Sequence, residues 1–214
     1  MTGRSQVTFR GTMTAVRDGV DAIVELLNEQ GYAFAHPKRA YLPPAAGAGE
    51  IVDAIEARVG PVAPALRAAW EVVGSYDLTG SHPDWPVTAC LMLPGANEGP
   101  GGVWLTDPLV LYSPADVVAR LDDAEEEFRD RIPVWPDAYH KAGYSGAPET
   151  CIAVPSSDAQ GELIEGDPSA RRPPTLVRYL RWALTEYGGF PGLETIGPAE
   201  WPRLDELRRM VVPF

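Results

Sequence analysis

Residues 178–194 read RYLRWALTEYGGFPGLE, in which a helical pattern runs directly into two glycines, an aromatic residue and a proline. Gly188 and Gly189 can adopt positive φ angles, which reverse the chain and satisfy the last carbonyl groups of a helix. Phe190 can then fold back on the final turn, as hydrophobic residues commonly do beyond a helix C-cap, and Pro191 prevents the helix from continuing. The stretch is therefore predicted to be a helix stop with an anchoring ring, and it does not require a ligand.

The same kind of pattern predicts further helices and strands on either side of this stretch. Apolar residues at three- and four-residue spacing predict helices, and short apolar runs between glycines, prolines or aspartates predict strands. Because helices and strands occur in groups and do not alternate strictly, the pattern indicates a single α+β domain with a largely antiparallel sheet packed against helices. Helices are expected at 18–30, 50–59, 63–73, 114–130, 175–187 and 202–210, and strands at 75–78, 87–93, 102–105, 108–113, 150–154 and 161–166.

The chain is expected to divide into an N-terminal segment and a main body. Residues 1–48 are predicted to hold a helix and a connection rich in Pro, Gly and Ala, and residues 49–214 the α+β body with a short C-terminal helix. Residues 1–16 are polar and weakly patterned, which favours a strand or a loose arm before that first helix. In the body, Ser113 and Asp116 stand at the spacing of a variant capping box, which predicts a helix start.

The charge balance and the cysteine count limit the possible functions and the expected cellular compartment. The chain has 18 basic and 30 acidic residues, a formal net charge of −12. This balance argues against a general nucleic-acid binder, because phosphate contacts need a basic face, and it permits attraction to a basic partner. No window has the apolar core of a signal peptide or the roughly 18 apolar residues of a membrane span. Cys90 and Cys151 make no disulfide framework, so a reducing cytoplasm is the expected compartment.

No stretch of the sequence has the spacing of a catalytic or metal-binding motif. Ser145 in GYSGAP lacks the Gly-x-Ser-x-Gly spacing of a nucleophile elbow, and a histidine that could serve it as a base cannot be placed from sequence. His82 and Asp84 form only a local pair, and the glycine-rich residues 95–102 lack the Lys-Ser/Thr of a phosphate loop. We therefore expect a non-enzymatic chain with no metal or cofactor, while a hydrolase that uses Ser145 and a histidine is the rival hypothesis.

Carboxylates and tryptophans gather in two parts of the sequence. The run DDAEEEFRD at 122–130 is either a solvated face of the predicted acidic helix or a docking surface for a basic protein. The loops DWP and WPD place tryptophans beside carboxylates, and exposed aromatic side chains of this kind suit an interface hot spot. If the chain binds a protein, the candidate partner-binding residues are Asp84, Trp85, Asp122, Asp123, Glu126, Glu127, Asp130, Trp135 and Asp137.

Several segments, taken in order, resemble the SUKH superfamily. This Smi/Knr-like group includes cell-wall regulators and many bacterial toxin-immunity proteins. PALRAAWEVVG followed by SYDL is similar to its early signature, and the remaining segments are similar to later parts of bacterial members. The segments that carry the likeness are PALRAAWEVVG (64–74), SYDL (75–78), DPLVLY (107–112), KAGYSGAPETCIAVP (141–155) and RYLRWALTEYGGFPGL (178–193).

This resemblance implies an α+β domain with a sheet packed on helices, no catalytic constellation and a role in binding another protein. Many bacterial members neutralise a co-encoded toxin, often a nuclease, by binding it. For this chain the resemblance therefore implies a cytoplasmic immunity protein whose partner is a basic toxin domain, with no direct contact to nucleic acid or to a membrane. A regulatory, scaffold or small-ligand-binding protein of the same fold is the alternative.

Overall fold

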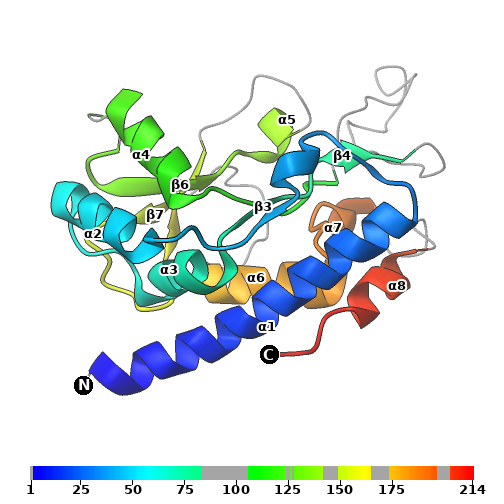
Figure 1. Cartoon of the computed structure of the whole chain (residues 1–214), viewed down its shortest axis with the longest axis horizontal. Coiled ribbons are helices and arrows are strands. Elements are labelled where there is room, and N and C mark those ends of the chain that lie inside the picture. Colours follow the sequence, from blue (N-terminus) through cyan, green and yellow to red (C-terminus); the bar gives the residue numbers. More distant parts are fainter. Residues whose placement is uncertain are drawn as a thin grey trace.

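The computed structural model of the chain shows an α+β domain in which long helices lie along one side of small antiparallel sheets (Figure 1). The structure describes residues 2–82, 106–123, 126, 128–141, 149–164, 174–196 and 203–214. Its helices are α1 (Thr2–Glu29), η1 (Pro37–Arg39), α2 (Ala48–Val59), α3 (Pro64–Ala68), η2 (Ala69–Val73), α4 (Pro114–Asp123), α5 (Ala138–Lys141), α6 (Leu176–Tyr187), α7 (Leu193–Ile196) and α8 (Leu204–Arg209). Its strands are β1 (Ala33–Phe34), β2 (Tyr41–Leu42), β3 (Ser75–Asp77), β4 (Gly80–Ser81), β5 (Val110–Leu111), β6 (Arg131–Trp135), β7 (Thr150–Ala153) and β8 (Leu163–Ile164).

The strands pair in three antiparallel groups, in the orders β1-β4, β2-β3-β5 and β6-β7-β8. The predicted pairing of 150–154 with 161–166 is confirmed, because Cys151 lies opposite Ile164 in the β7–β8 ladder. A backbone hydrogen bond of 2.9 Å from Tyr112 to Val134 joins the ends of the second and third groups. The predicted strands 87–93 and 102–105 lie outside the described residues.

The N-terminal helix is longer than the sequence predicted and belongs to the core. Helix α1 begins at Thr2, so the strand or loose arm expected at 1–16 is wrong. Its buried side chains continue at three- and four-residue spacing towards the N-terminus, and the stripe packs on α3, η2 and α6. The segment from Met13 to Ala40 therefore shares one hydrophobic core with the rest of the domain. The stripe consists of Met13, Val16, Val20, Ile23 and Leu27.

The glycine-rich end of α6 is the helix stop that the sequence predicted. Gly188 has a φ of 55° and Gly189 a φ of 91°, both in the left-handed region that glycine tolerates. The Gly189 N–H donates to the Ala183 carbonyl over 2.9 Å, which satisfies an end carbonyl of the helix. Phe190 is buried, and its ring centroid lies 6.1 Å from that of Tyr32. The Gly189 carbonyl also accepts the Leu109 N–H over 2.8 Å, so the turn fixes the chain that enters β5.

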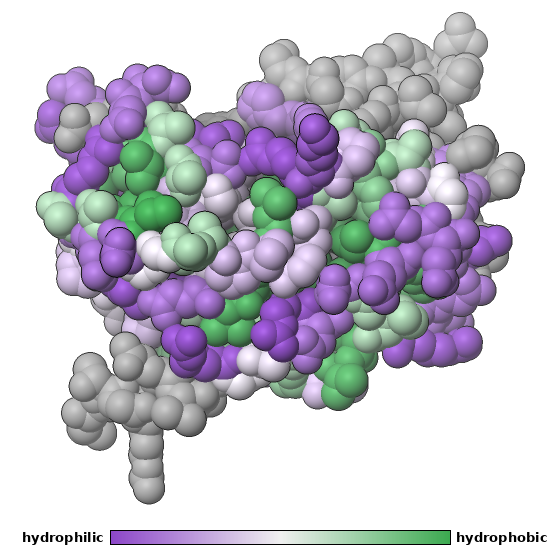
Figure 2. Space-filling view, in the orientation of Figure 1, coloured by the Kyte–Doolittle hydropathy of each residue, from purple (hydrophilic) through white to green (hydrophobic). Residues whose placement is uncertain are grey.

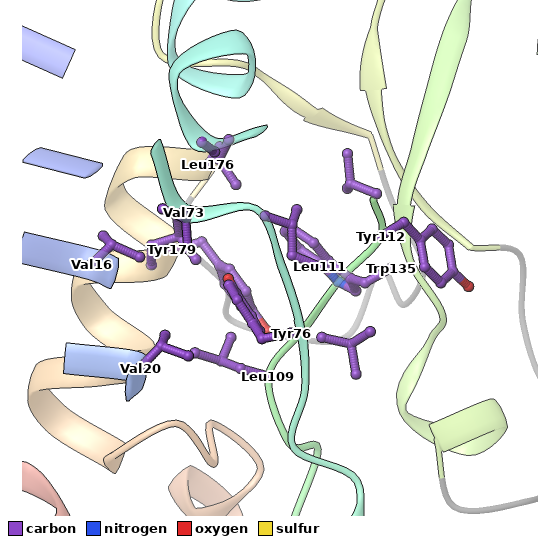
Figure 3. Packing of buried hydrophobic residues seen from close by; sticks show 14 of the residues in the cluster. Val16, Val20, Val73, Tyr76, Leu109, Leu111, Tyr112, Trp135, Leu176 and Tyr179 are labelled. Atoms are coloured by element: carbon purple, nitrogen blue, oxygen red, sulfur yellow. The ribbon is translucent and has the colours of Figure 1, made fainter. Parts of the chain in front are cut away.

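The core lies where α1 and α6 face the strands (Figure 3). Trp135 of β6 stacks on Tyr179 of α6, with ring centroids 4.7 Å apart and an interplanar angle of 16°. Tyr76 of β3 lies beside Tyr179, and Val16 of α1 approaches from the helical side (Figure 3). Tyr112 points away from these side chains (Figure 3) and is nevertheless buried, because the Arg120 guanidinium covers its ring.

Helix α4 begins as the sequence predicted and ends earlier. The Asp116 N–H donates to Ser113 Oγ over 3.1 Å, and the Ser113 N–H donates to Asp116 Oδ2 over 3.1 Å, which confirms the reciprocal capping box. The helix ends at Asp123, and Phe128 is already buried in the approach to β6. The continuous acidic helix expected to reach Asp130 is therefore wrong.

Replacing Asp116 with asparagine is expected to remove an acid-sensitive part of the stability. Burial opposes ionisation, but hydrogen bonds from Ser113 and the charge of Arg39 lower the pKa of Asp116 below its ordinary value. A lowered folded-state pKa stabilises the fold above the unfolded-state value of about 4 and loses this effect as the pH falls through the folded-state value. Asp116→Asn should therefore cost about 0.5–1 kcal/mol near neutral pH and progressively less below pH ~4. Urea unfolding of the variant and the unmodified chain near neutral pH and below pH ~4 tests this. A difference in unfolding free energy that grows towards acid pH would contradict the prediction.

Candidate functional site

Four of the acidic residues expected to bind a partner are exposed in the structure, and arginines neutralise three of these four locally. Asp122 lies 2.6 Å from Arg58 Nη1, Glu126 lies 3.0 Å from Arg129 Nη2, and Asp130 lies 2.8 Å from Arg131 Nε. The hydrogen bond from Arg131 lowers the pKa of Asp130. Asp123 is exposed at the end of α4. Ion pairs at the surface leave a weaker field than the sequence alone suggests.

Two of the candidate partner-binding residues are buried, which corrects the sequence prediction. Trp135 is 1% exposed because it stacks on Tyr179 in the core, and Asp137 is 2% exposed and accepts a hydrogen bond from His140. Neither side chain can serve as an exposed contact for a protein partner. Asp84, Trp85 and Glu127 lie outside the described residues.

The face drawn in Figure 2 has no single continuous hydrophobic area over the described residues. Hydrophilic side chains gather over the end of α4 and along α1 and α8, and hydrophobic side chains lie between them in small separate areas (Figure 2). A permanent protein interface usually has a larger apolar centre. Recognition on this face would therefore depend on polar and charged groups.

A cleft of about 350 Å³, lined by both apolar and ionisable side chains, opens between η1, β3 and α4, close to α5. It is formed by residues far apart in the sequence, and several of them are ionisable. The chain brings them together because β3 pairs with β2 and β5, while α4 and α5 follow β5 and β6. The ionisable and aromatic residues of its wall include His36, Arg39, Asp77, Tyr112, Arg120 and His140.

Both histidines of the cleft are held through Nδ1 by a carboxylate. His36 Nδ1 lies 2.9 Å from Asp77 Oδ2, and His140 Nδ1 contacts Asp137 Oδ2. An ionised carboxylate can only accept hydrogen bonds, so Nδ1 carries the proton and Nε2 of the neutral ring is the acceptor. The His36 and His140 side chains remain 60% and 45% exposed. The arrangement thus fixes each ring and leaves much of its other side accessible.

Two arginines of the cleft are oriented in the same way. Arg39 Nη2 lies 2.7 Å from Asp116 Oδ2, and Arg120 Nε lies 3.0 Å from Glu149 Oε1. The Arg120 guanidinium also stacks over the Tyr112 ring, 3.7 Å from its centroid. Burial, with the nearby Glu149 as a second cause, raises the pKa of Tyr112, so its hydroxyl stays protonated and donates to Glu149 over 2.7 Å. Each guanidinium is therefore held in one orientation at the wall.

Beneath the cleft lies a buried ion pair. Lys141 Nζ lies 2.7 Å from Asp107 Oδ1, and the two side chains are 1% and 4% exposed. Asp107 has a φ of 46°, a left-handed conformation that aspartate tolerates better than most residues. Because Lys141 ends α5, the pair connects this short helix to the chain that enters β5. It positions His140, the residue just before Lys141.

A second cleft, of about 410 Å³, lies between α1, α2 and α3. Arg67 occupies its wall and contacts Asp53 at 2.7 Å, Glu56 at 2.6 Å and Glu71 at 3.4 Å. Burial opposes its charge, but the hydrogen bonds that Arg67 donates to Asp53 and Glu56 raise the pKa of Arg67. Arg10 adds an ion pair with Glu71 at 2.8 Å. These contacts join the three helices, which gives the network a structural role.

The histidine cleft could not be predicted from the sequence. His36 and Asp77 are 41 residues apart, so nothing local marks them as a pair. Asp137 and His140 are three residues apart, which is a local signal. The pattern of this loop, a tryptophan beside a carboxylate, instead predicted a contact with a protein partner. His82 instead contacts the Gln30 carbonyl through Nε2 at 2.8 Å. Ser145, the serine of the rival hydrolase hypothesis, lies outside the described residues.

Comparison of the chain with protein-family models, with curated proteins and with solved structures finds no match. Across the described ranges, no group of three or more His, Cys, Asp or Glu residues could hold a metal ion. No helix in that part of the chain is long and apolar enough to cross a membrane.

Proposed function

We propose that this chain is a non-enzymatic protein-binding module of the SUKH-like type, which neutralises a basic toxin domain by covering its functional surface. The observation that carries the proposal is the charge of two adjacent helices. Helices α2 and α4 pack side by side and carry six carboxylates against two arginines of their own (Figure 1). Arg39 and Arg67 from neighbouring segments pair with three of the six, so carboxylates still outnumber the arginines of this surface. The carboxylates are Glu50, Asp53, Glu56, Asp116, Asp122 and Asp123, and the arginines are Arg58 and Arg120.

The physical basis is electrostatic complementarity. A surface with excess carboxylates attracts a basic protein and speeds the encounter, especially at low ionic strength. A nuclease needs a basic face to hold phosphates, so an acidic protein that covers this face competes with the nucleic acid. The net charge of −12 acts in the same direction over a longer range. The ordered likeness to SUKH segments supports the same class of function.

A charge-reversal experiment tests the proposal on the toxin domain encoded beside this gene. The triple variant Asp53→Lys, Asp122→Lys and Asp123→Lys inverts three of the four exposed carboxylates of α2 and α4. We expect its association rate with the toxin domain to fall about tenfold or more at low salt, and the salt dependence of binding to become flatter. Surface plasmon resonance over a series of salt concentrations measures both effects.

The matched control changes the net charge by the same amount on another face. Asp21, Glu25 and Glu29 are exposed on α1, and their replacement with lysine leaves α2 and α4 intact. The control should lose much less affinity than the triple variant of α2 and α4. Equal losses would mean that only net charge matters, and full binding by the α2 and α4 variant would place the interface elsewhere. Neighbouring genes that encode no toxin would contradict the immunity role itself.

A small-ligand-binding function is the second candidate, and the histidine cleft favours it. The cleft has fixed hydrogen-bonding groups and an accessible opening, which are features of ligand sites. Its wall is distinct from the exposed carboxylates of α2 and from the end of α4. The two functions can therefore be tested separately.

A further inference from the structure

We infer that the cleft between η1, β3, α4 and α5 binds a protonated oxyanion, namely monohydrogen phosphate or a singly protonated phosphate monoester. The inference does not depend on the proposed protein-binding function. It follows from the combination of fixed donors and fixed acceptors in one cleft of about 350 Å³. Neither kind of group alone would specify this ligand.

The donors are the guanidinium groups of Arg39 and Arg120. Asp116 and Arg120 are four residues apart in α4, so they lie on the same face of the helix, about one turn apart. Arg39 is bound to Asp116, which brings its guanidinium to that face. Each guanidinium has five N–H donors in a rigid fork that suits an oxyanion, and the carboxylate contacts fix its direction.

The acceptors are the Nε2 atoms of His36 and His140. Because Asp77 and Asp137 hold the Nδ1–H groups, a neutral imidazole presents an unprotonated Nε2. His36 also lies in the same turn as Arg39, whose N–H donates to the His36 carbonyl over 2.8 Å. An anion between these groups can thus accept from an arginine and donate to a histidine.

This combination selects for a proton on the ligand. Monohydrogen phosphate has one O–H group that can donate to Nε2, whereas sulfate has none near neutral pH. Sulfate would leave the partly exposed imidazole acceptors to water, whereas monohydrogen phosphate gains a charge-assisted hydrogen bond to them. The cations of the wall, Arg39, Arg120 and Lys141, are each paired with a carboxylate, and Asp77 and Asp137 face neutral histidines, so net charge does not contribute to the affinity. Discrimination therefore depends on hydrogen bonds.

The first experiment compares two anions on the full chain. Isothermal titration near neutral pH, at constant ionic strength, is done with sodium phosphate and with sodium sulfate. We expect saturable phosphate binding that is about tenfold tighter than sulfate binding, the value of one charge-assisted hydrogen bond. A nucleoside monophosphate in a third titration distinguishes a phosphate monoester from the free ion. Equal affinity for phosphate and sulfate, or no saturable phosphate binding, would overturn the inference.

Variants then assign the roles of the residues. Arg39→Gln should weaken both anions about tenfold, because it removes a donor that both require. The double variant His36→Asn and His140→Asn keeps an amide donor near the position of Nδ1 and removes Nε2. It should reduce phosphate binding to the level of sulfate and leave sulfate unchanged. An unchanged preference for phosphate over sulfate in the double variant would show that the histidines do not recognise the proton of the ligand.

The matched control is Arg58→Gln, which removes the same charge outside the cleft. Arg58 pairs with Asp122 at 2.6 Å and is not part of the cleft wall. The affinity of Arg58→Gln for both anions should equal that of the unmodified chain, and an equal loss in Arg58→Gln and Arg39→Gln would contradict the site. Circular dichroism of each variant verifies folding.

Imidazole ¹⁵N spectra of the unmodified chain test the inference without any variant. Phosphate should shift the Nε2 resonances of His36 and His140, and unchanged resonances would contradict the inference.

Discussion

Replacing Lys141 with methionine is expected to lower the free energy of unfolding by about 3–5 kcal/mol. The ammonium group lies 2.7 Å from Asp107 Oδ1, and both side chains are almost fully buried. Methionine fills a similar volume but removes the charge that compensates the aspartate. A buried carboxylate without its opposite charge is strongly destabilising. Urea unfolding of the variant and the unmodified chain measures the difference.

The control for this prediction removes both charges. Lys141→Met combined with Asp107→Asn leaves two neutral side chains, and asparagine tolerates the left-handed φ of 46° at residue 107. The double variant should recover a large part of the lost stability, because replacing a buried ion pair costs much less than breaking it. A single variant that costs less than about 1 kcal/mol, or a double variant no better than the single one, would show that this pair does not act as described.

The same ion pair links the stability of the fold to the cleft. Lys141 and Asp107 connect α5 to the chain before β5, and His140 lies in α5 beside Lys141. Loosening α5 would move the imidazole that Asp137 holds at the cleft wall. A site built on fixed donors and acceptors is sensitive to such small displacements. Stability and ligand recognition therefore share residues in this region.

Elements with a strong local signal could be predicted from the sequence. The stop at Gly188 and Gly189 depends on backbone conformations that glycine adopts without strain, and it is confirmed. The capping box of Ser113 and Asp116 depends on a spacing of three residues, and it is also confirmed. The antiparallel pair that includes Cys151 and Ile164 depends on short apolar runs close together in the chain. In each case the interacting groups lie near one another in the sequence.

Features that depend on distant contacts could not be predicted. The part of α1 before Asp18 has a weak apolar pattern, and burial of Met13 and Val16 where α1 packs on α3 and η2 compensates for this. Trp135 stands before a proline and an aspartate, which indicates a loop, yet Tyr179 from another part of the chain covers its ring. The histidine cleft requires residues from η1 to α5, and no periodicity relates them. Tertiary packing decided all three.

The candidate docking surface also combines features that the sequence could predict with features that depend on distant contacts. Composition located carboxylates such as Asp122 and Asp123, which are exposed at the end of α4. It could not show that Arg58, 64 residues away from Asp122, neutralises one of them. It also missed the contribution of α2, because Asp53 and Glu56 become part of the surface only when α2 packs beside α4. The net field of a surface follows from neighbours in space.

Replacing Trp70 with alanine is also expected to cost about 3–5 kcal/mol of unfolding free energy. The indole is completely buried in the π-helical turn η2, where α1 packs against the segment. Alanine leaves a large cavity and deprives the Tyr112 carbonyl of the Nε1–H donor that lies 2.9 Å away. The conservative variant Trp70→Phe keeps most of the apolar volume and removes the hydrogen bond, so it should cost about 1–3 kcal/mol. Chemical unfolding monitored by circular dichroism measures both values.

The matched comparison is Trp182→Ala, the same substitution at a partly exposed position of α6. Trp182 makes an edge contact with Tyr187, whose ring centroid lies 5.0 Å away, and it borders solvent. Its removal should cost less than half as much as that of Trp70, because less apolar surface returns to water and no enclosed cavity forms. Equal costs at the two positions would mean that the α1–η2 contact contributes no more to stability than a surface ring.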